Sequence, residues 1–322
     1  MSTKKILLSG VKPTGRPHIG NYFGAMKQYV DLQNTHDCHI FIADLHALTT
    51  VQNGAELSQG TYDLLLDYLA IGLDPAKVTI FKQSDVPQVA ELGWIFNCIT
   101  TMPYLMRAHA FKDSEAKNKE INVGIFDYPL LMAADILIQD ADVVPVGQDQ
   151  KQHVEYARDT AEKFNRIFGG SGTAEIFKLP QPIILDSVKT VPGIDGQKMS
   201  KSYKNHIPLF AEDEELKKLV MSIVTDSSSG VPTNVRAIHE LFRSPAELGA
   251  LYAEKAGKYK DLKEALLADL IAFVTPLRTR RAELAKNRTQ VIAILKAGGE
   301  KARARAEAKM ETVRKVTGLK VE

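Results

Sequence analysis

Cysteine is scarce in this chain: Cys38 and Cys98 are the only two among 322 residues. Two isolated cysteines argue against a disulfide framework and indicate a reducing compartment, and they cannot by themselves hold a zinc or iron–sulfur site. No stretch approaches the roughly 20 apolar residues of a membrane span. The apolar run near the N-terminus is also too short for a signal peptide. We therefore expect a cytoplasmic protein without a membrane segment, and no metal site built from its own side chains.

The net charge is small, but its distribution is uneven. An apolar fraction of 44%, a charged fraction of 25% and a formal charge of +2 are typical of a soluble globular protein. Residues 271–322 carry 13 Lys and Arg against five Asp and Glu, a net of +8, so the rest of the chain carries −6. This basic segment could follow a phosphate backbone, or it could simply be a solvated helix face. Its candidates for phosphate contact are Lys301, Arg303, Arg305, Lys309, Arg314 and Lys315.

Strand and helix patterns alternate at the spacing of βαβ units in the first two thirds of the chain. Short apolar runs predict strands within 4–10, 38–48, 78–85, 142–147 and 182–186. Helical spacing predicts helices over 21–32, 56–72, 88–100, 128–139 and 148–168, with Pro129 in the first turn of the fourth. Beyond residue 206 only helical patterns continue. The sequence predicts an α/β fold, with a doubly wound parallel, Rossmann-like sheet domain over 1–205 and a smaller helical domain over 206–322.

A loop rich in glycine and proline joins the first predicted strand to the first predicted helix. It reads PTGRPHIGN over residues 13–21. In open α/β sheets this crevice is where nucleotides bind, and Gly15 and Gly20 allow the backbone to approach a ligand closely. His18 could donate a hydrogen bond to a phosphate oxygen. A glycine-rich turn with an incidental histidine is the alternative for such a loop taken alone.

A second loop carries two lysines among small polar residues. Residues 198–202 read KMSKS and follow the segment VPGIDGQ. Lys198 and Lys201 could neutralise a triphosphate, Ser200 and Ser202 could add hydrogen bonds, and the glycines before them would let the loop close over a nucleotide. The alternative is a basic surface loop.

Together the two loops resemble the signatures of the class I aminoacyl-tRNA synthetases, the first usually written His-Ile-Gly-His and here ending in Asn21. The resemblance implies adenylate formation: the amino-acid carboxylate attacks the α-phosphorus of ATP, and pyrophosphate leaves. It implies Mg²⁺ with the phosphates and no general base, because catalysis rests on positioning and charge neutralisation. The catalytic residues that it implies are His18, Lys198 and Lys201.

Two further segments, 128–137 (YPLLMAADIL) and 144–153 (VPVGQDQKQH), resemble the tryptophanyl-tRNA synthetases of the bacterial type. The resemblance implies that Asp135 accepts the indole N–H, that Asp149 contacts the ATP ribose and that Lys112 reaches the triphosphate. It implies L-tryptophan, tRNA(Trp) and a homodimeric partner copy as ligands and partners. The implied tryptophan-binding residues are Leu8, Tyr128, Met132, Asp135, Val144, Val146 and Gln150. The implied ATP-binding residues are Lys12, Thr14, Gly20, Asn21, Lys112, Gly147, Asp149, Lys198, Met199, Ser200, Lys201 and Ser202.

The residues themselves support Asp135 as a binding group. It interrupts an apolar helix, and a buried carboxylate without a partner costs several kcal/mol, so it needs a donor. Tyr128, Met132 and Asp135 are spaced i, i+4 and i+7 on one helix face. Such a face fits a flat apolar ligand with a single N–H donor. The alternative is that Asp135 caps a neighbouring element.

Three residues depart from the pattern of the family. Lys12 stands where many relatives have Gln, Gln148 replaces a frequent Glu, and Gln197 replaces a frequent Lys. These changes put the details of the ATP contacts in doubt. The competing functions are a tyrosyl-tRNA synthetase, a non-catalytic synthetase relative that binds RNA, and a small nucleotidyltransferase. The intact His18, Lys198 and Lys201 argue against the non-catalytic relative. A small nucleotidyltransferase could share the His-containing start, but it would not need a helical C-terminal domain or the full five-residue lysine loop.

Overall fold

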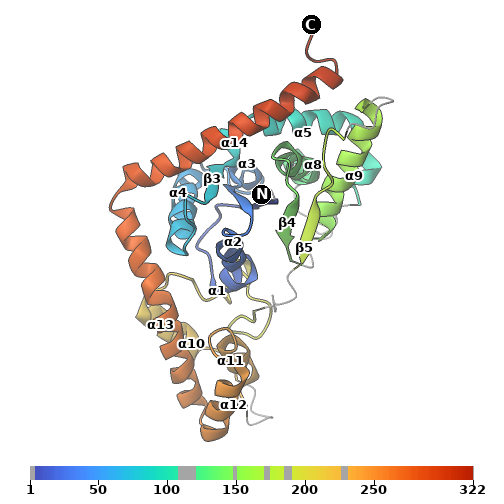
Figure 1. The fold of residues 1–322 in the computed structure, drawn as a ribbon. Coiled ribbons are helices and arrows are strands. Elements are labelled where there is room, and N and C mark those ends of the chain that lie inside the picture. Colours follow the sequence, from blue (N-terminus) through green and yellow to red (C-terminus); the bar gives the residue numbers. More distant parts are fainter. Residues whose placement is uncertain are drawn as a thin grey trace.

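The computed structural model describes residues 4–107, 121–147, 151–169, 175–184, 191–225 and 231–321. At its centre lies a five-stranded sheet with the order β3-β2-β1-β4-β5, in which every pairing is parallel (Figure 1). The strands are β1 (Ile6–Val11), β2 (Asp37–Ile42), β3 (Val78–Lys82), β4 (Val143–Val146) and β5 (Gln181–Ile184). The predicted doubly wound parallel fold is confirmed.

The strand order reverses between β1 and β4, the topological switch point of the sheet. In open α/β sheets this is where ligands bind, outside the carboxyl ends of the strands. The chain leaves β1 directly into the glycine-rich loop, and then enters one helical run made of α1 (Ile19–Asn21), the π-helical turn η1 (Tyr22–Met26) and α2 (Lys27–Leu32). The glycine-rich loop that follows the first strand therefore lies at the crevice.

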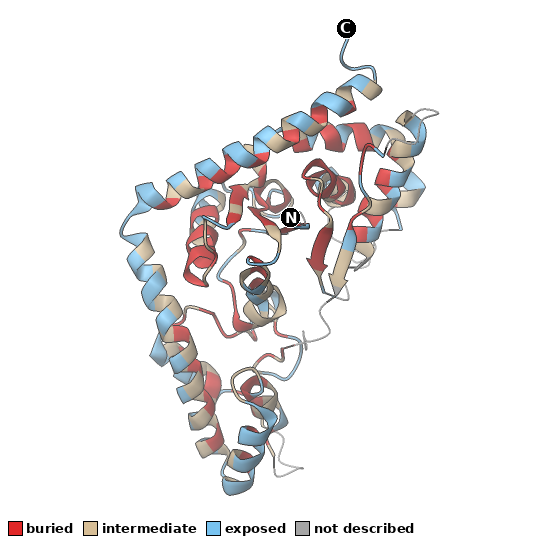
Figure 2. Cartoon of the chain, in the orientation of Figure 1, coloured by how far each residue is buried: buried red, intermediate tan, exposed pale blue. Residues whose placement is uncertain are grey.

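Alternate strand residues build two separate apolar layers on the two faces of the sheet. Leu7 and Ile40 join the cluster beneath α2 and α4, whereas Leu8 and Phe41 join the cluster beneath α5 and α8. This alternation follows from the two-residue period of a strand. Figure 2 shows the buried residues concentrated where the helices face the strands. The covering helices are α3 (Asp44–Ala47), α4 (Gly54–Ala70), η2 (Gln83–Asp85), α5 (Gln88–Ile99), α6 (Met102–Leu105), α8 (Val123–Ile138) and α9 (Lys151–Phe168).

The helix α8 begins five residues earlier than the sequence predicts. Asn122 is its N-cap, and its side chain accepts a hydrogen bond from the backbone N–H of Ile125 at 3.0 Å. Pro129 consequently lies inside the helix, and its predicted place in the first turn is wrong. The cap satisfies an N–H of the first turn, so the helix can start before the apolar run from which its beginning was predicted.

Beyond the lysine loop, which contains η4 (Lys201–Tyr203), the described chain is helical as predicted. The helices are α10 (Asp213–Met221), α11 (Thr233–His239), α12 (Pro245–Glu254), α13 (Tyr259–Ala285) and α14 (Arg288–Val316). Figure 1 shows α10 to α13 forming a separate lobe. Within the described ranges, no helix is long and apolar enough to cross a membrane.

The last helix, α14, returns to the sheet domain. It packs against the edge strand β3 and against α5 and α8 (Figure 1). A Cβ atom at Gly298 would lie 1.8 Å from the carbonyl oxygen of Ile80, so only glycine allows this approach. A helix in this place shields an exposed strand edge. The predicted domain boundary at residue 205 assigns α14 to the helical domain. In space, however, α14 packs against the sheet domain.

Candidate active site

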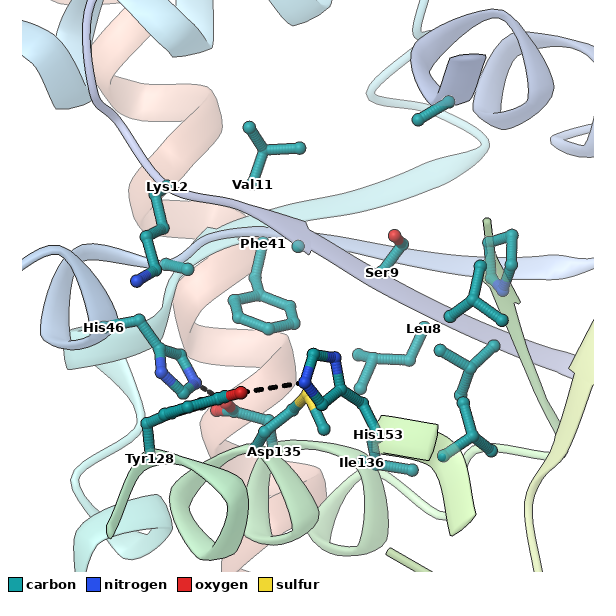
Figure 3. A pocket seen from close by; sticks show the side chains of 18 of the residues that line it. Leu8, Ser9, Val11, Lys12, Phe41, His46, Tyr128, Asp135, Ile136 and His153 are labelled. Carbon is teal, nitrogen blue, oxygen red and sulfur yellow. Dashed lines mark hydrogen bonds and ion pairs between the residues drawn. The ribbon is translucent and has the colours of Figure 1, made fainter. Parts of the chain in front are cut away.

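A cavity of about 860 Å³ opens at the switch point, between the carboxyl ends of β1, β2 and β4 and the helix α8 (Figure 3). Its walls are mainly apolar, with a few polar groups, as in most small-molecule sites. Eight of the residues predicted to bind ATP or tryptophan line it: Leu8, Lys12, Tyr128, Met132, Asp135, Val144, Val146 and Gly147.

Asp135 lies in the wall of this cavity, with 4% of its surface exposed. Two side chains of the protein already donate to its carboxylate. His46 Nε2 lies 3.0 Å from Oδ2, and Gln83 Nε2 lies 3.0 Å from Oδ1 and 2.8 Å from Oδ2. Burial raises the pKa of the Asp135 carboxyl, although the hydrogen bonds from His46 and Gln83 act in the opposite direction. The sequence argument that this carboxylate needs a partner is right, and the protein supplies the first partners itself.

The sequence analysis did not select His46 or Gln83. His46 follows β2 and Gln83 follows β3, each at the carboxyl end of a parallel strand. Polar residues directly after a buried strand are the signal that could have identified them, because those strand ends meet at the ligand-binding edge of the sheet.

Tyr128 stands on the same helix as Asp135 and is held by His153. The Tyr128 hydroxyl lies 2.8 Å from His153 Nε2, and the two rings meet edge to face (Figure 3). His153 also lines the cavity and comes from α9, at the end of the second segment that resembles the synthetases. Two helices therefore fix the position of the tyrosine at the cavity wall.

His18 is 5% exposed and forms the N-terminal cap of α1. Its ring Nδ1 accepts from the backbone N–H of Asn21 at 3.2 Å. The backbone N–H of His18 donates to Asn21 Oδ1 at 3.1 Å. Burial, and then the nearby charges of His206 and Lys201, lower the pKa of His18 to about 4. The imidazole is therefore neutral at pH 7, and with Nδ1 acting as an acceptor its proton is on Nε2. Gly20 is required beside it, because a Cβ there would lie 2.9 Å from Nδ1.

Lys201 brings the two loops together across more than 180 residues of sequence. Its Nζ donates to the carbonyl oxygen of Thr14 and, at 3.1 Å, to that of Gly15. Gly15 has a φ of +63°, a conformation that glycine adopts without strain. The ammonium group therefore occupies the mouth of the glycine-rich loop, where a phosphate could replace the two carbonyls.

The lysine loop is anchored by a residue that the sequence analysis missed. Asn205 is 2% exposed; its Oδ1 accepts from the Ser200 N–H at 2.8 Å, and its Nδ2 donates to the Lys198 carbonyl at 3.2 Å. Met199 is buried against the core that contains Ile19. Ser202 donates its backbone N–H to Ser200 Oγ at 3.3 Å. Asn205 and Met199 therefore anchor the lysine loop to the rest of the protein. An asparagine three residues after the loop was the sequence feature that could have identified this anchor.

The predicted residues Lys112, Asp149 and Gln150, and the departure at Gln148, lie outside the described residues. The departure at Lys12 does lie in the cavity, where burial lowers the pKa of its ammonium group (Figure 3). The other departure, Gln197, donates its backbone N–H to Asp195 at 3.0 Å. One cationic group has therefore been added to the cavity wall itself.

Comparisons with known proteins agree with this geometry. The family described as tRNA synthetases class I (W and Y) matches residues 2–295. A tryptophan–tRNA ligase of Fusobacterium nucleatum is 48% identical over 320 residues, covering 97% of each chain. One from Rhodopirellula baltica is 44% identical over 323 residues, covering 98% of this chain and 99% of the other. A crystal structure of tryptophanyl-tRNA synthetase from Campylobacter jejuni, complexed with ADP and tryptophan, superposes with a TM-score of 0.89 at 41% identity, covering 97% of this chain and 99% of that one.

Proposed function

Because this chain belongs to the class I tRNA synthetases of the tryptophan and tyrosine group, we propose that it activates L-tryptophan with ATP and transfers the tryptophan to tRNA(Trp). The observation that carries the proposal is the apolar cavity with one buried carboxylate, Asp135, in its wall. Relatives that span nearly the whole chain are tryptophan–tRNA ligases. The reaction is adenylate formation with release of pyrophosphate, followed by transfer of the aminoacyl group.

At the amino-acid end, we assign the indole to the space between Leu8, Val144 and Val146. Asp135 accepts the indole N–H there, and Met132 packs against the ring. Tyr128, held by His153, and Gln150 bind the amino-acid backbone. Two observations support this assignment: the apolar walls of the cavity, and the edge-to-face contact by which His153 positions Tyr128.

At the phosphate end, the proposed ligand is ATP, bound along the glycine-rich loop. Neutral His18 donates from Nε2 to a phosphate oxygen, and the backbone near Thr14, Gly20 and Asn21 approaches the nucleotide. Gly147 and Asp149 contact the ribose side, and Lys12 and Lys112 add positive charge. The lysine loop, with Lys198, Met199, Ser200, Lys201 and Ser202, stabilises the pyrophosphate as it leaves. Charge stabilisation of this kind needs no general base.

Mg²⁺ would accompany the ATP phosphates. It prefers oxygen ligands, keeps several waters and is often held through substrate phosphates. In the described part of the chain, no three His, Cys, Asp or Glu side chains are grouped as an ion site. The phosphate oxygens are therefore the ligands that we propose for it.

We further propose a cytoplasmic homodimer whose helical domain, over 206–322, contacts tRNA. Large apolar side chains are exposed on α5, α6 and the start of α8: Trp94, Met102, Met106 and Val123 are 71%, 61%, 48% and 78% exposed. Both α5 and α6 contact α8, and exposed apolar side chains on neighbouring helices are typical of an interface. Sedimentation of the protein and of Trp94→Glu tests this, since the variant should be monomeric if α5 lies in the dimer interface.

The decisive test of the function is ATP–pyrophosphate exchange with each of the twenty amino acids. We expect tryptophan to support exchange far better than any other. Better exchange with tyrosine would replace tryptophan by tyrosine as the substrate. If no amino acid supports exchange, the protein would instead be a non-catalytic synthetase relative that binds RNA.

A further inference from the structure

Gln83 is a fully buried side chain, 0% exposed, at the start of η2. Its Oε1 accepts the backbone N–H of His46 at 3.1 Å. Its Nε2 donates to both oxygens of Asp135, at 3.0 and 2.8 Å. It lies behind Asp135 and is not one of the described residues that line the cavity. Any effect of Gln83 on a ligand therefore passes through Asp135 or His46.

The hydrogen bonds form a closed ring of three residues. The backbone N–H of His46 donates to Gln83, and Gln83 donates to Asp135. The His46 ring lies 3.0 Å from Asp135 (Figure 3). The orientation of the Gln83 amide is determined, because a backbone N–H can only donate and must face the amide oxygen. The NH₂ group must then face the carboxylate. Reversing the amide would break all three of these hydrogen bonds at once.

The backbone that carries Gln83 is fixed independently. The carboxylate of Asp44 accepts from the backbone N–H of Ser84 at 2.9 Å and also from the Ser84 hydroxyl. These bonds tie η2 to α3, the helix that carries His46. Gln83 and His46 therefore approach Asp135 from two elements that hydrogen bonds connect to each other.

The donors are distributed unequally over the two oxygens of Asp135. Among the residues that the structure describes, Oδ2 accepts from both His46 and Gln83, whereas Oδ1 accepts from Gln83 alone. A carboxylate oxygen has two acceptor positions. Oδ1 consequently retains one acceptor position, which suits a single N–H donor from the cavity.

From this geometry we infer that Gln83 is a positioning residue for amino-acid specificity. It holds the Asp135 carboxylate in the orientation that presents Oδ1 to the indole N–H. The inference rests on the proposed function, since it explains how a tryptophan-specific carboxylate is kept in place. It adds a residue that does not touch the substrate.

The test compares Gln83→Met, which keeps the volume but removes both polar atoms, with a matched control, Gln139→Met. Gln139 is also buried, at 1% exposure, and donates to the Ala302 carbonyl at 3.1 Å, and it does not line the cavity. Hydrogen bonds to charged groups are worth roughly 10- to 100-fold in an equilibrium. We expect Gln83→Met to raise the KM for tryptophan by about that factor in pyrophosphate exchange. The KM for ATP and the kcat should change by less than about 3-fold, and the preference for tryptophan over phenylalanine should fall.

Gln83→Glu gives a second measurement, which does not depend on tolerance of an apolar residue. It keeps an acceptor for the His46 N–H but places a second carboxylate against Asp135. Two carboxyl groups in contact share a proton, so the introduced group can donate in place of the amide once it is protonated. The tryptophan KM of this variant should therefore improve relative to the parent as the pH falls. The ionisable groups around position 83 are the same in both proteins: His46 and Asp44 on α3, and Tyr128, His153 and Lys12 at the cavity. The difference between the two pH profiles therefore reports position 83.

Three results decide the inference. A selective rise in the tryptophan KM for Gln83→Met, absent from Gln139→Met, supports it, as does recovery of Gln83→Glu at lower pH. Equal losses of thermal stability in the two Met variants, with the ratio of tryptophan to phenylalanine unchanged, would overturn it and leave Gln83 a structural residue. A parent protein that prefers another amino acid overturns the proposed function, and the inference with it, before any variant is measured.

Discussion

The two ends of the active site are organised differently. At the end that we propose for the amino acid, the carboxylate of Asp135 accepts from the buried side chains of His46 and Gln83, and the described residues leave one acceptor position of Oδ1 unused. At the phosphate end, the ammonium group of Lys201 is bound to the carbonyls of Thr14 and Gly15, which are themselves part of the glycine-rich loop. The first arrangement is ready for its ligand. The second must give up its internal bonds when ATP enters.

This difference indicates that the amino-acid end serves recognition and that the phosphate end serves catalysis. A preformed acceptor loses little on binding and rejects ligands that lack the donor, because the buried group would then be unpaired. A lysine that exchanges carbonyls for phosphate oxygens moves with its loop, and such steps can accompany lid closure. We therefore expect changes at the phosphate end to act on kcat and changes at the amino-acid end to act on KM and selectivity.

Replacing Lys201 should have the largest effect and tests the phosphate end. Lys201→Ala removes the cation that we propose to stabilise the departing pyrophosphate. The rate of adenylate formation should fall by about 10²-fold or more, as for single electrostatic donors in other enzymes. Tryptophan affinity should hardly change. Single-turnover adenylate formation and calorimetric tryptophan binding measure the two quantities.

Lys217→Ala is the matched control, since Lys217 is exposed on the nearby helix α10. It should retain the parent rate. An equal loss in both variants would point to a general effect of charge, and normal turnover in Lys201→Ala would show that the loop does not hold the phosphates.

Replacing Asp135 by asparagine tests the amino-acid end. The sequence alone predicts that Asp135→Asn has a milder effect than Asp135→Ala, because asparagine keeps one acceptor. The contacts reverse this expectation: His46, Gln83 and the indole present three donors, and the amide has a single oxygen and adds two donors of its own. We expect kcat/KM for tryptophan to fall by roughly 10²-fold in Asp135→Asn, about as much as in Asp135→Ala.

In both Asp135 variants the advantage of tryptophan over phenylalanine should shrink, since the penalty of an unpaired charge has gone. Amino-acid-dependent pyrophosphate exchange gives both numbers. An Asn variant that is nearly as active and selective as the parent would mean that His46 does not donate to position 135 when tryptophan is bound.

Much of this organisation could be predicted from the sequence, for physical reasons that also explain the failures. Apolar runs and helical periods located all five strands, because burial imposes those periods. The spacing of Tyr128, Met132 and Asp135 placed them on one wall of the cavity. Three residues were missed: Gln83, His46 and Asn205. Gln83 and His46 bind Asp135, which lies far away in sequence. Asn205 lies in a loop, where no hydrophobic period marks a residue. The start of α8 was misjudged because the Asn122 cap lies before its apolar run.

The role of the basic C-terminal segment also could not be determined from the sequence alone. Arg314 on α14 binds Glu91 through two bonds of 2.7 Å, and Lys309 lies 2.6 Å from Asp140. Arg303 donates to the Asp85 carbonyl at 2.7 Å, and Arg305 lies 3.5 Å from Asp37. These cations therefore hold α14 on the sheet domain. Their positive charge in the sequence does not by itself indicate an RNA-binding surface.

Removing one of these anchors should have a moderate effect that is seen in stability. Arg314→Ala should lower the free energy of unfolding by about 1 kcal/mol, as expected for a partly exposed bidentate ion pair. The salt dependence of tRNA binding should not change. Urea unfolding and tRNA titrations at several salt concentrations measure these effects. Lys301→Ala, on the exposed side of the same helix, should leave stability unaltered, and a smaller salt slope in that variant alone would assign tRNA contact to the outer face of α14.

The smallest effect should come from the titration of His18, and it tests the view that this histidine of the phosphate end is neutral and bonded within the protein. The folded protein lowers the pKa of His18 from 6.5 to about 4. The unfolded chain therefore binds a proton more readily between these values, so the contribution of His18 is complete above pH 6.5 and is lost as the pH falls toward 4. His18→Asn keeps a side chain that can cap α1 but removes the titration. The loss of unfolding free energy between pH 7 and pH 5 should be smaller in this variant than in the parent, as measured by urea unfolding at both values. His206 and His239 titrate in both proteins, so they cancel in the difference. Equal losses would mean that His18 is already protonated in the folded state at pH 5, and that it then meets ATP as a cation at that pH.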